Sequence, residues 1–517
     1  MTEPVVKSNE QAGSLREAMN EVWSLAWPTV LTMTSFTIMQ FTDKLMVSKV
    51  GPLEVAAQGN AGTWAFAVIA TVMGVVTVVN TYVSQHLGAG SPEKGPKYAW
   101  SAGWMAMFFW TIIILPWAFL IHLVFDFIHK GNDELISLET EYAVYTLVGS
   151  LFLLVGRGFS QYFFGMHKPK IITVSTVIAN IINVTSNYIL IFGEEGIPSL
   201  LPGIPGTPAL GLKGAAIATV IGMFMEMLIP FLIFIGPKFH KQYLTRSAWR
   251  PCLNTMKEIF KLGWPGSIQW GNEIICWALF MTVFVGTFGT NDMAAGWIAL
   301  GYLHLSFMPA IGINVAVNSI VGKHIGAGNP DIAVSRARVG VSMAAIYMSV
   351  CAAIFIIFRY DFIAWFVTGA DTPPEDKAAI IEIGAKMLIM VAIFQTIDAL
   401  GIVYTGALRG AGDTVWPGVV TAIYSWVLIV GGGWIAITFF SEIGSIGPWI
   451  AASAYVILIG ITMAVRFEKG GWRSIDLLGR NTIQDEARRA SPLTIGPPAS
   501  EPDSAIADFV DPADPEP

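Results

Sequence analysis

The sequence predicts an all-α polytopic membrane protein, with twelve transmembrane helices in two six-helix lobes related by a parallel internal repeat. Hydrophobic residues make up 54% of the 517 residues and charged residues only 13%, against roughly 25% charged in soluble domains. Apolar stretches recur along the whole chain, and the second half repeats motifs of the first. A soluble fold cannot bury so much apolar surface, because domain cores stop growing at about 250–300 residues.

Each apolar stretch is long enough to cross a hydrocarbon core of roughly 30 Å. In the first half the expected spans are 22–48, 59–82, 98–124, 141–164, 171–192 and 213–236. In the second half they are 262–288, 294–320, 337–358, 380–408, 415–440 and 446–466. The residues before position 22 are polar and charged, which is not typical of a cleavable signal peptide, so we expect the first span to remain.

These spans divide the chain into five segments. They are a cytoplasmic N-terminal segment (1–21), an N-terminal lobe (22–236), a cytoplasmic linker (237–261), a C-terminal lobe (262–466) and a tail (467–517). The tail is rich in proline and acidic residues, which predicts a disordered cytoplasmic segment.

The distribution of positive charge predicts the orientation. The linker carries Lys238, Lys241, Arg246, Arg250, Lys257 and Lys261, and the alternate loops on the opposite side are acidic. Because lysine and arginine mark the cytoplasmic side, we expect a multi-pass protein of the cytoplasmic (inner) membrane with both termini cytoplasmic.

Two pairs of matching motifs reveal the repeat. Gln85-His-Leu-Gly-Ala-Gly90 matches Lys323-His-Ile-Gly-Ala-Gly328, and Leu25-Ala-Trp-Pro28 matches Leu262-Gly-Trp-Pro265. Six spans separate the members of each pair, so both halves have the same orientation and the repeat is parallel. The glycines of the first pair indicate turns with positive φ and not phosphate-binding loops.

Several other classes of protein are disfavoured. No GxxxxGK[ST] loop is present for an ATP-driven pump, and no HExxH or GxSxG motif indicates an enzyme. Cys252, Cys276 and Cys351 fit neither a metal pattern nor a disulfide framework, so each is expected to pack as a small apolar side chain.

The sequence resembles the multidrug and toxic compound extrusion (MATE) family over about residues 20–466. The resemblance is carried by Pro28, Asp43 and the segments 51–57, 85–93, 183–193, 214–219, 323–331, 395–398 and 406–410. It implies a NorM-like secondary active antiporter that exports cationic or amphiphilic small molecules in exchange for Na⁺ or H⁺. It also implies a central cleft between the lobes, with no enzymatic activity and no cofactor other than the coupling ion.

An ionisable residue inside a span costs several kcal/mol and usually has a function. In the first lobe the resemblance places Asp43, Asn183, Asn187 and Thr219 around one polar pocket for a monovalent cation or a proton. Some members have an aspartate at the position of Asn187. Because this chain has an asparagine there, Asp43 is the only carboxylate expected in the pocket. The alternative is an ion pair of Asp43 with Lys44 at the lipid–water boundary. Arg157 and Glu226 are expected to neutralise each other.

In the second lobe, Glu273 and Asp398 match carboxylates that hold the cation in NorM-like members. Two buried carboxylates repel each other unless a cation or proton lies between them. NorM-like members often have a tyrosine at the position of Phe394, which keeps only the aromatic face for a cation. The alternative is that Glu273 and Asp398 form packing hydrogen bonds with Asn272, Gln395 or Thr396.

Substrate binding is expected in the cleft, where methionine and aromatic side chains suit flat cations. The cleft candidates are Met33, Phe36, Met39, Gln40, Trp270 and Trp277. Bends are expected at Pro28, Pro265, Gly62, Gly74 and Gly312.

The expected partners are small-molecule drugs or organic cations and the lipid bilayer, with a monomeric chain and no nucleic acid. A flippase for lipid-linked oligosaccharide or peptidoglycan precursors is the alternative, although the acidic cavity candidates have the wrong sign for a pyrophosphate.

Overall fold

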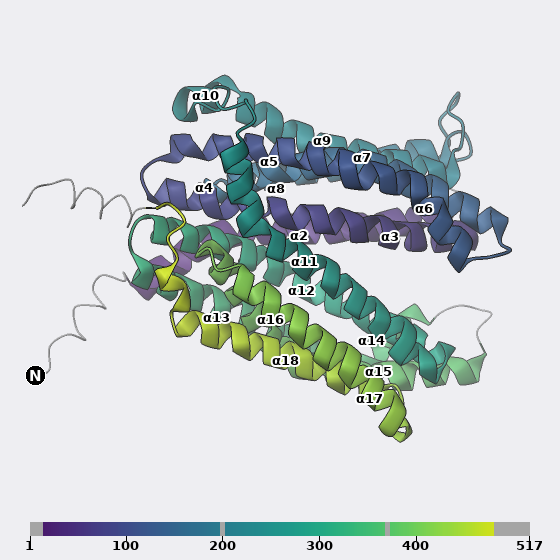
Figure 1. Ribbon diagram of the computed structural model, residues 1–517. Coiled ribbons are helices and arrows are strands. Elements are labelled where there is room, and N and C mark those ends of the chain that lie inside the picture. Colours follow the sequence, from purple (N-terminus) through teal and green to yellow (C-terminus); the bar gives the residue numbers. More distant parts are fainter. Residues whose placement is uncertain (1–13, 197–201, 368–372, 480–517) are drawn as a thin grey trace, which may run out of the picture. The chain divides into compact units, whose positions relative to one another are not determined.

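The computed structural model describes residues 14–196, 202–367 and 373–479, and the elements it assigns to them are helices. Its first half contains eight α-helices (Figure 1). They are α2 (Leu15–Val47), α3 (Pro52–Val76), α4 (Val79–Gly88), α5 (Gly95–Phe109), α6 (Leu115–Ile128), α7 (Asp133–Gly165), α8 (Pro169–Asn187) and α9 (Gly211–Ile235). The π-turns η2 (Trp110–Ile114) and η3 (Tyr188–Phe192) continue α5 into α6 and extend α8.

The linker forms a short helix, α10 (Pro237–Tyr243), before the second half begins. The second half contains α11 (Leu253–Leu279), α12 (Thr290–Gly326), α13 (Pro330–Ile357), α14 (Arg359–Phe366), α15 (Pro374–Gly410), α16 (Val415–Tyr424), α17 (Gly432–Phe439) and α18 (Ile446–Glu468). The π-turns η4 (Phe280–Val285) and η6 (Ser425–Gly431) extend α11 and join α16 to α17. Every predicted span coincides with one of these helices or continuous helix pairs.

Eleven helices of the described part are long and apolar enough to cross a membrane. The twelfth crossing is α2, which has the length but a more polar sequence. Four of its five threonines donate their hydroxyls to backbone carbonyls of the same helix; Thr29, for example, donates to Ala26 O at 2.8 Å. The predicted twelve-span, two-lobe architecture is therefore confirmed.

Helix ends follow the local sequence. Ser14 caps α2 through a reciprocal pair of hydrogen bonds with Glu17, as expected for a capping box. In the repeated loops, Gly90 and Gly328 adopt φ of +70° and +79°, a conformation that glycine adopts without steric cost. The two copies of the motif thus form the same turn.

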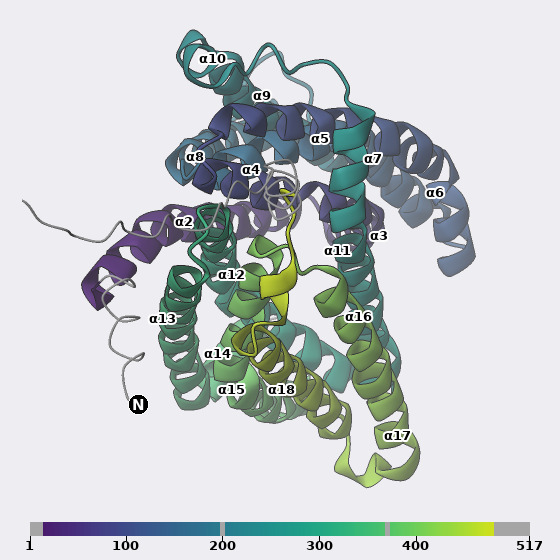
Figure 2. The same cartoon turned by 60° about the vertical axis from the view of Figure 1, so that its left-hand side comes forward.

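The two lobes meet along two sets of helix contacts. One set joins α12 to α2 and α4, and the other joins α11 to α3 (Figure 2). A Cβ atom at Gly312 of α12 would lie 2.6 Å from Val30 Cα of α2, and one at Gly74 of α3 would lie 2.5 Å from Ser267 Cα of α11. These glycines, which we expected to supply bends, allow close contact between the lobes.

Hydrogen bonds between the lobes gather at one end of the helices, which we call the basic end because Lys94, Lys168, Lys323 and Lys469 lie there. Thr81 Oγ1 donates to Arg409 O at 3.0 Å, and Gln85 Nε2 donates to Gly410 O at 3.0 Å. Ser319 Oγ donates to Phe164 O at 2.6 Å. We refer to these contacts, with the Thr29–Gly312 hydrogen bond of 2.7 Å, as the basic seam.

Some expected details need correction. Cys252 is exposed and does not pack as an apolar side chain, whereas Cys276 is buried. Residues beyond 466 continue to pack, because Trp472 is 2% exposed and stacks on Phe467. The prediction called residues 467–517 disordered, and residues 480–517 of this tail lie outside the described residues, as do residues 1–13 of the N-terminal segment.

Candidate functional site

The first polar cluster lies in the N-terminal lobe. Asn187 Nδ2 on α8 donates to Asp43 Oδ1 on α2 at 2.6 Å, and also lies 3.2 Å from Asn183 Oδ1. Asn183 Nδ2 donates in turn to Ala218 O of α9 at 3.2 Å. Three helices thus hold Asp43, which is 8% exposed. No ion pair joins Asp43 to Lys44 among the described residues, so the boundary ion-pair alternative is wrong.

Tyr142 and Gln58 complete this cluster, and sequence reasoning missed both. The Tyr142 side chain interacts with the side chains of Gln58 and Thr219 and lies close enough to Asp43 to interact with its charge. The buried Oδ1 of Asn187 and Oε1 of Gln58 have no hydrogen-bond donor within the described chain. These two oxygens and the Asp43 carboxylate are oxygen donors of the kind that hard cations prefer. The available signal in the sequence was their position: Tyr142 lies inside the predicted span 141–164, and Gln58 lies at the edge of the predicted span 59–82.

The second cluster lies in the C-terminal lobe and contains Glu273 on α11 and Asp398 on α15. Tyr455 on α18 donates a hydrogen bond of 3.0 Å to Glu273 Oε1, and Asp398 interacts electrostatically with Glu273. Within the described residues, no donor is hydrogen-bonded to the Asp398 carboxylate. Both carboxylates are partly exposed, and removing a carboxylate even partly from water without a partner is costly, so this pair is suited to a proton or a monovalent cation.

The packing alternative for these carboxylates is wrong, because its three partners are engaged elsewhere. Asn272 binds Ser425 Oγ at 2.7 Å and Trp426 Nε1 at 2.6 Å. Gln395 Nε2 donates to Ser306 Oγ at 2.6 Å, and Thr396 pairs with Ser349 at 2.9 Å. These three residues fix the helices around the pair and make no hydrogen bond to either carboxylate.

Two further residues define the surroundings of the pair. Phe394 is fully buried in the core of the lobe, and the hydroxyl that reaches Glu273 comes from Tyr455 on another helix. Arg409 at the basic end of α15 interacts electrostatically with Glu273, but no carboxylate of the described chain lies within 4.0 Å of it. Sequence reasoning gave Arg409 no role.

The cleft candidates lie at the surfaces of α2 and α11. Met33, Phe36 and Met39 are partly exposed and Gln40 is exposed. Trp270 is also partly exposed, while Trp277 makes an edge contact with Phe280. Their role in substrate binding stays a prediction.

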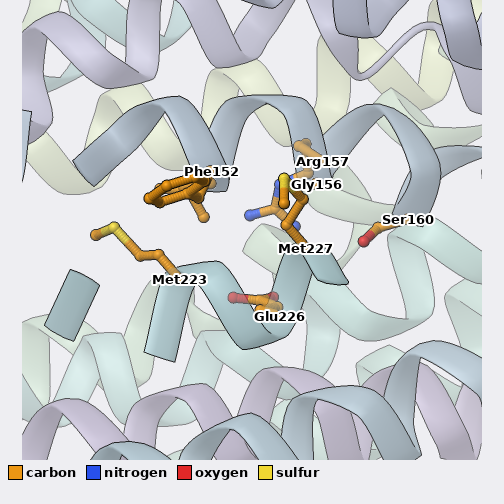
Figure 3. Close-up of a pocket in the computed structure, with 8 residues that line it drawn as sticks. Phe152, Gly156, Arg157, Ser160, Met223, Glu226 and Met227 are labelled. Carbon is orange, nitrogen blue, oxygen red and sulfur yellow. The ribbon is translucent and has the colours of Figure 1, made fainter. Parts of the chain in front are cut away.

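Arg157 and Glu226 line a separate pocket between α7 and α9, together with Phe152, Met223 and Met227 (Figure 3). They interact electrostatically but do not form an ion pair within 4.0 Å in the described structure. Within the same residues, no group of three or more histidine, cysteine or acidic side chains could hold a metal ion.

The MatE family model matches residues 28–189 and 274–435, which together cover more than half of the chain and one stretch in each lobe. The chain is 26% identical to a probable multidrug resistance protein NorM of Pseudomonas putida, over 90% of this chain and 96% of that protein. It is 27% identical to the multidrug resistance protein NorM of Burkholderia vietnamiensis, over 86% and 92% of the two chains.

Solved structures with the same fold include an outward-facing multidrug resistance MATE transporter of the MOP superfamily. It superimposes with a TM-score of 0.77 at 19% identity, covering 89% of this chain and 97% of that one. A MOP superfamily transporter from Pyrococcus furiosus, described as having a binding pocket of reversed polarity, gives 0.78 at 19% identity, with coverages of 89% and 97%.

Proposed function

The chain belongs to the MATE (MatE) family, and on this premise we propose that it is a secondary active multidrug antiporter of the cytoplasmic membrane. It exports cationic or amphiphilic small molecules and takes up Na⁺ or H⁺ in exchange. The NorM relatives, which match over nearly their whole length, support drug efflux. They do not favour the flippase alternative.

The observation that carries the coupling step is the Glu273–Asp398 pair. Glu273 accepts one hydrogen bond, from the Tyr455 hydroxyl, and Asp398 accepts none from the described chain. With Arg409 as the third charge near Glu273, the ionised cluster carries one net negative charge. One monovalent cation or one proton would neutralise it, which fits an exchange in which ion and drug alternate.

Coupling requires that the ion bind one conformation of the transporter better than the other. In the conformation described, the lobes are joined at the basic seam. The positive-inside pattern supports a cytoplasmic basic end, so the carboxylate pair would receive ions from the opposite side of the membrane. Ion binding would then favour separation of the seam and release of the drug outward.

The N-terminal cluster is the second candidate for the coupling site. It is favoured by the buried Asp43 carboxylate, its 2.6 Å hydrogen bond to Asn187 and two buried oxygens without donors among the described residues. Proton transfer fits this cluster better than Na⁺ binding, because Asp43 is its only carboxylate.

The test is ethidium efflux from cells that lack their major pumps, with Na⁺ and H⁺ gradients imposed separately. The proposal expects efflux that follows one gradient in the wild type and fails in Glu273→Gln and Asp398→Asn. Glu382→Gln, at an exposed carboxylate paired with Lys386, is the matched control and should transport normally. If Asp43→Asn abolishes gradient-driven efflux while Glu273→Gln spares it, coupling belongs to the N-terminal cluster. Wild-type efflux that ignores both gradients would reject an antiporter.

A further inference from the structure

A groove lies between α16 and α18 at the basic end, away from both carboxylate clusters. Its lining includes Trp416, Ile461, Val465, Arg466, Lys469 and Gly471. Ile461 and Val465 are exposed apolar side chains, and Lys469 follows Val465 by four residues, so all three lie along one face of α18. The apolar side chains of Ile461 and Val465 therefore form a wall that ends beside the positive charges of Arg466 and Lys469, where α18 ends.

Arg466 is held in place through its Nε atom and the face of its guanidinium group, and its two terminal nitrogens make no hydrogen bond within the described residues. Its Nε donates to Asp413 Oδ2 at 2.8 Å, and its guanidinium carbon lies 5.1 Å from the centroid of Trp416. A Cβ atom at position 471 would lie 2.5 Å from Arg466 Nη1, so Gly471 leaves that nitrogen open. Neither terminal nitrogen has a hydrogen-bond acceptor in the described chain.

Lys469 supplies the second cation and, unlike Arg466, forms no ion pair in the described part of the chain. It is exposed, and no carboxylate of the described residues lies within 4.0 Å of its ammonium group. Neighbouring cations of the same end are engaged, since Arg338 pairs with Glu468 and Arg473 pairs with Asp331. The Arg466 terminal nitrogens and the Lys469 ammonium group, beside a tryptophan and an apolar wall, match an anionic headgroup above an acyl chain.

We propose that this groove binds an anionic phospholipid of the leaflet at the basic end. The lipid phosphate contacts Arg466 and Lys469, and one acyl chain lies along Val465 and Ile461. Asp413, which orients Arg466, lies three residues after Gly410, whose carbonyl belongs to the basic seam. Bound lipid therefore stabilises the part of the C-terminal lobe that joins the seam.

The experiment titrates the full chain in detergent with phosphatidylglycerol, phosphatidylcholine or sodium phosphate. It reads the thermal midpoint and counts bound lipids by native mass spectrometry. Phosphatidylglycerol should bind and raise the midpoint, while the other two additives should have little effect. Lys469→Gln should weaken phosphatidylglycerol binding about fivefold, the expected effect of removing one cation from an anionic surface, and Lys469→Arg should restore it.

Lys241→Gln is the matched control, because Lys241 is an exposed lysine of the linker helix α10, outside the groove. It should bind lipid like the wild type. Arg466→Gln should weaken binding further, and if loss of the Asp413 pair prevents its folding, Lys469→Gln still decides the matter. Equal effects of both lipids on the wild type, or wild-type binding by Lys469→Gln, would overturn the proposal. A midpoint shift produced equally by sodium phosphate would assign the cations to free phosphate and also overturn it.

Discussion

The hydroxyl of Thr81 in the N-terminal lobe donates a hydrogen bond of 3.0 Å to the backbone carbonyl of Arg409 in the C-terminal lobe. The guanidinium of the same arginine interacts electrostatically with Glu273. Arg409 therefore connects the basic seam with the carboxylate pair through its backbone on one side and its charge on the other. A change in the charge of the pair acts directly on a residue of the seam.

Arg409→Gln should strengthen binding of the coupling cation and slow transport. Removing a positive charge near Glu273 takes away repulsion of the incoming cation, which in a partly buried site is worth about tenfold in affinity. Release then becomes slower, so both the KM for the ion and the maximal efflux rate should fall. Arg409→Lys keeps the charge and should change both values less. A raised KM in Arg409→Gln would contradict this electrostatic role.

Tyr455→Phe should strengthen coupling-ion binding by about tenfold while the protein still folds, because the lost hydroxyl stabilises the ionised Glu273 carboxylate that the ion must neutralise. The hydroxyl donates at 3.0 Å to Glu273, and hydrogen bonds to charged groups contribute about 1.5–3 kcal/mol. Ion-dependent efflux kinetics provide the measurement. Tyr302→Phe is the control, because Tyr302 donates to Phe362 O at 2.9 Å in the same lobe and touches neither carboxylate. Unchanged ion dependence in Tyr455→Phe would separate Tyr455 from the site.

Hydropathy predicted the helices well because span length is set by the bilayer and not by tertiary contacts. The predicted span 446–466 coincides with α18, Ile446–Glu468. The rarity of charge in spans also singled out Glu273 and Asp398. Tyr455 and Tyr142 were missed because aromatic residues are common in spans, and only the rotation of each helix decides which of them faces a carboxylate. Helix rotation is fixed by packing between distant segments, such as α18 against α15.

The pH dependence of stability should depend on Glu21, which precedes the first predicted span. Burial alone raises its pKa, but hydrogen bonds from His324 and Arg336, together with the charges of His324 and Lys323, hold the pKa of Glu21 well below its usual 4.5. The folded state therefore binds this proton less readily than the unfolded state. The stabilisation is complete above about pH 4.5 and is lost as the pH falls below it.

Thermal midpoints of wild type and Glu21→Gln between pH 7 and pH 3.5 test this link. The wild type should be the more stable at pH 7, because Glu21 Oε2 accepts from Arg336 Nε at 2.8 Å across the lobes. The difference between the two proteins should shrink below pH 4.5. A difference that stays constant over the whole range would show that the Glu21 cluster does not titrate with folding.

Gly312→Ala should open the basic seam. A Cβ atom there would lie 2.6 Å from Val30 N and Cα, and such overpacking costs about 1–3 kcal/mol, which shifts a two-state equilibrium at least several-fold. Spin labels at Lys94 and Lys469, in a cysteine-free background, report the distance between the lobes at the basic end. Gly312→Ala should populate a longer distance. Gly62→Ala is the control, because no heavy atom lies within 4 Å of its added Cβ and alanine favours a helix interior. Equal distance distributions for both variants would mean that the backbone contact of α2 with α12 does not hold the lobes together.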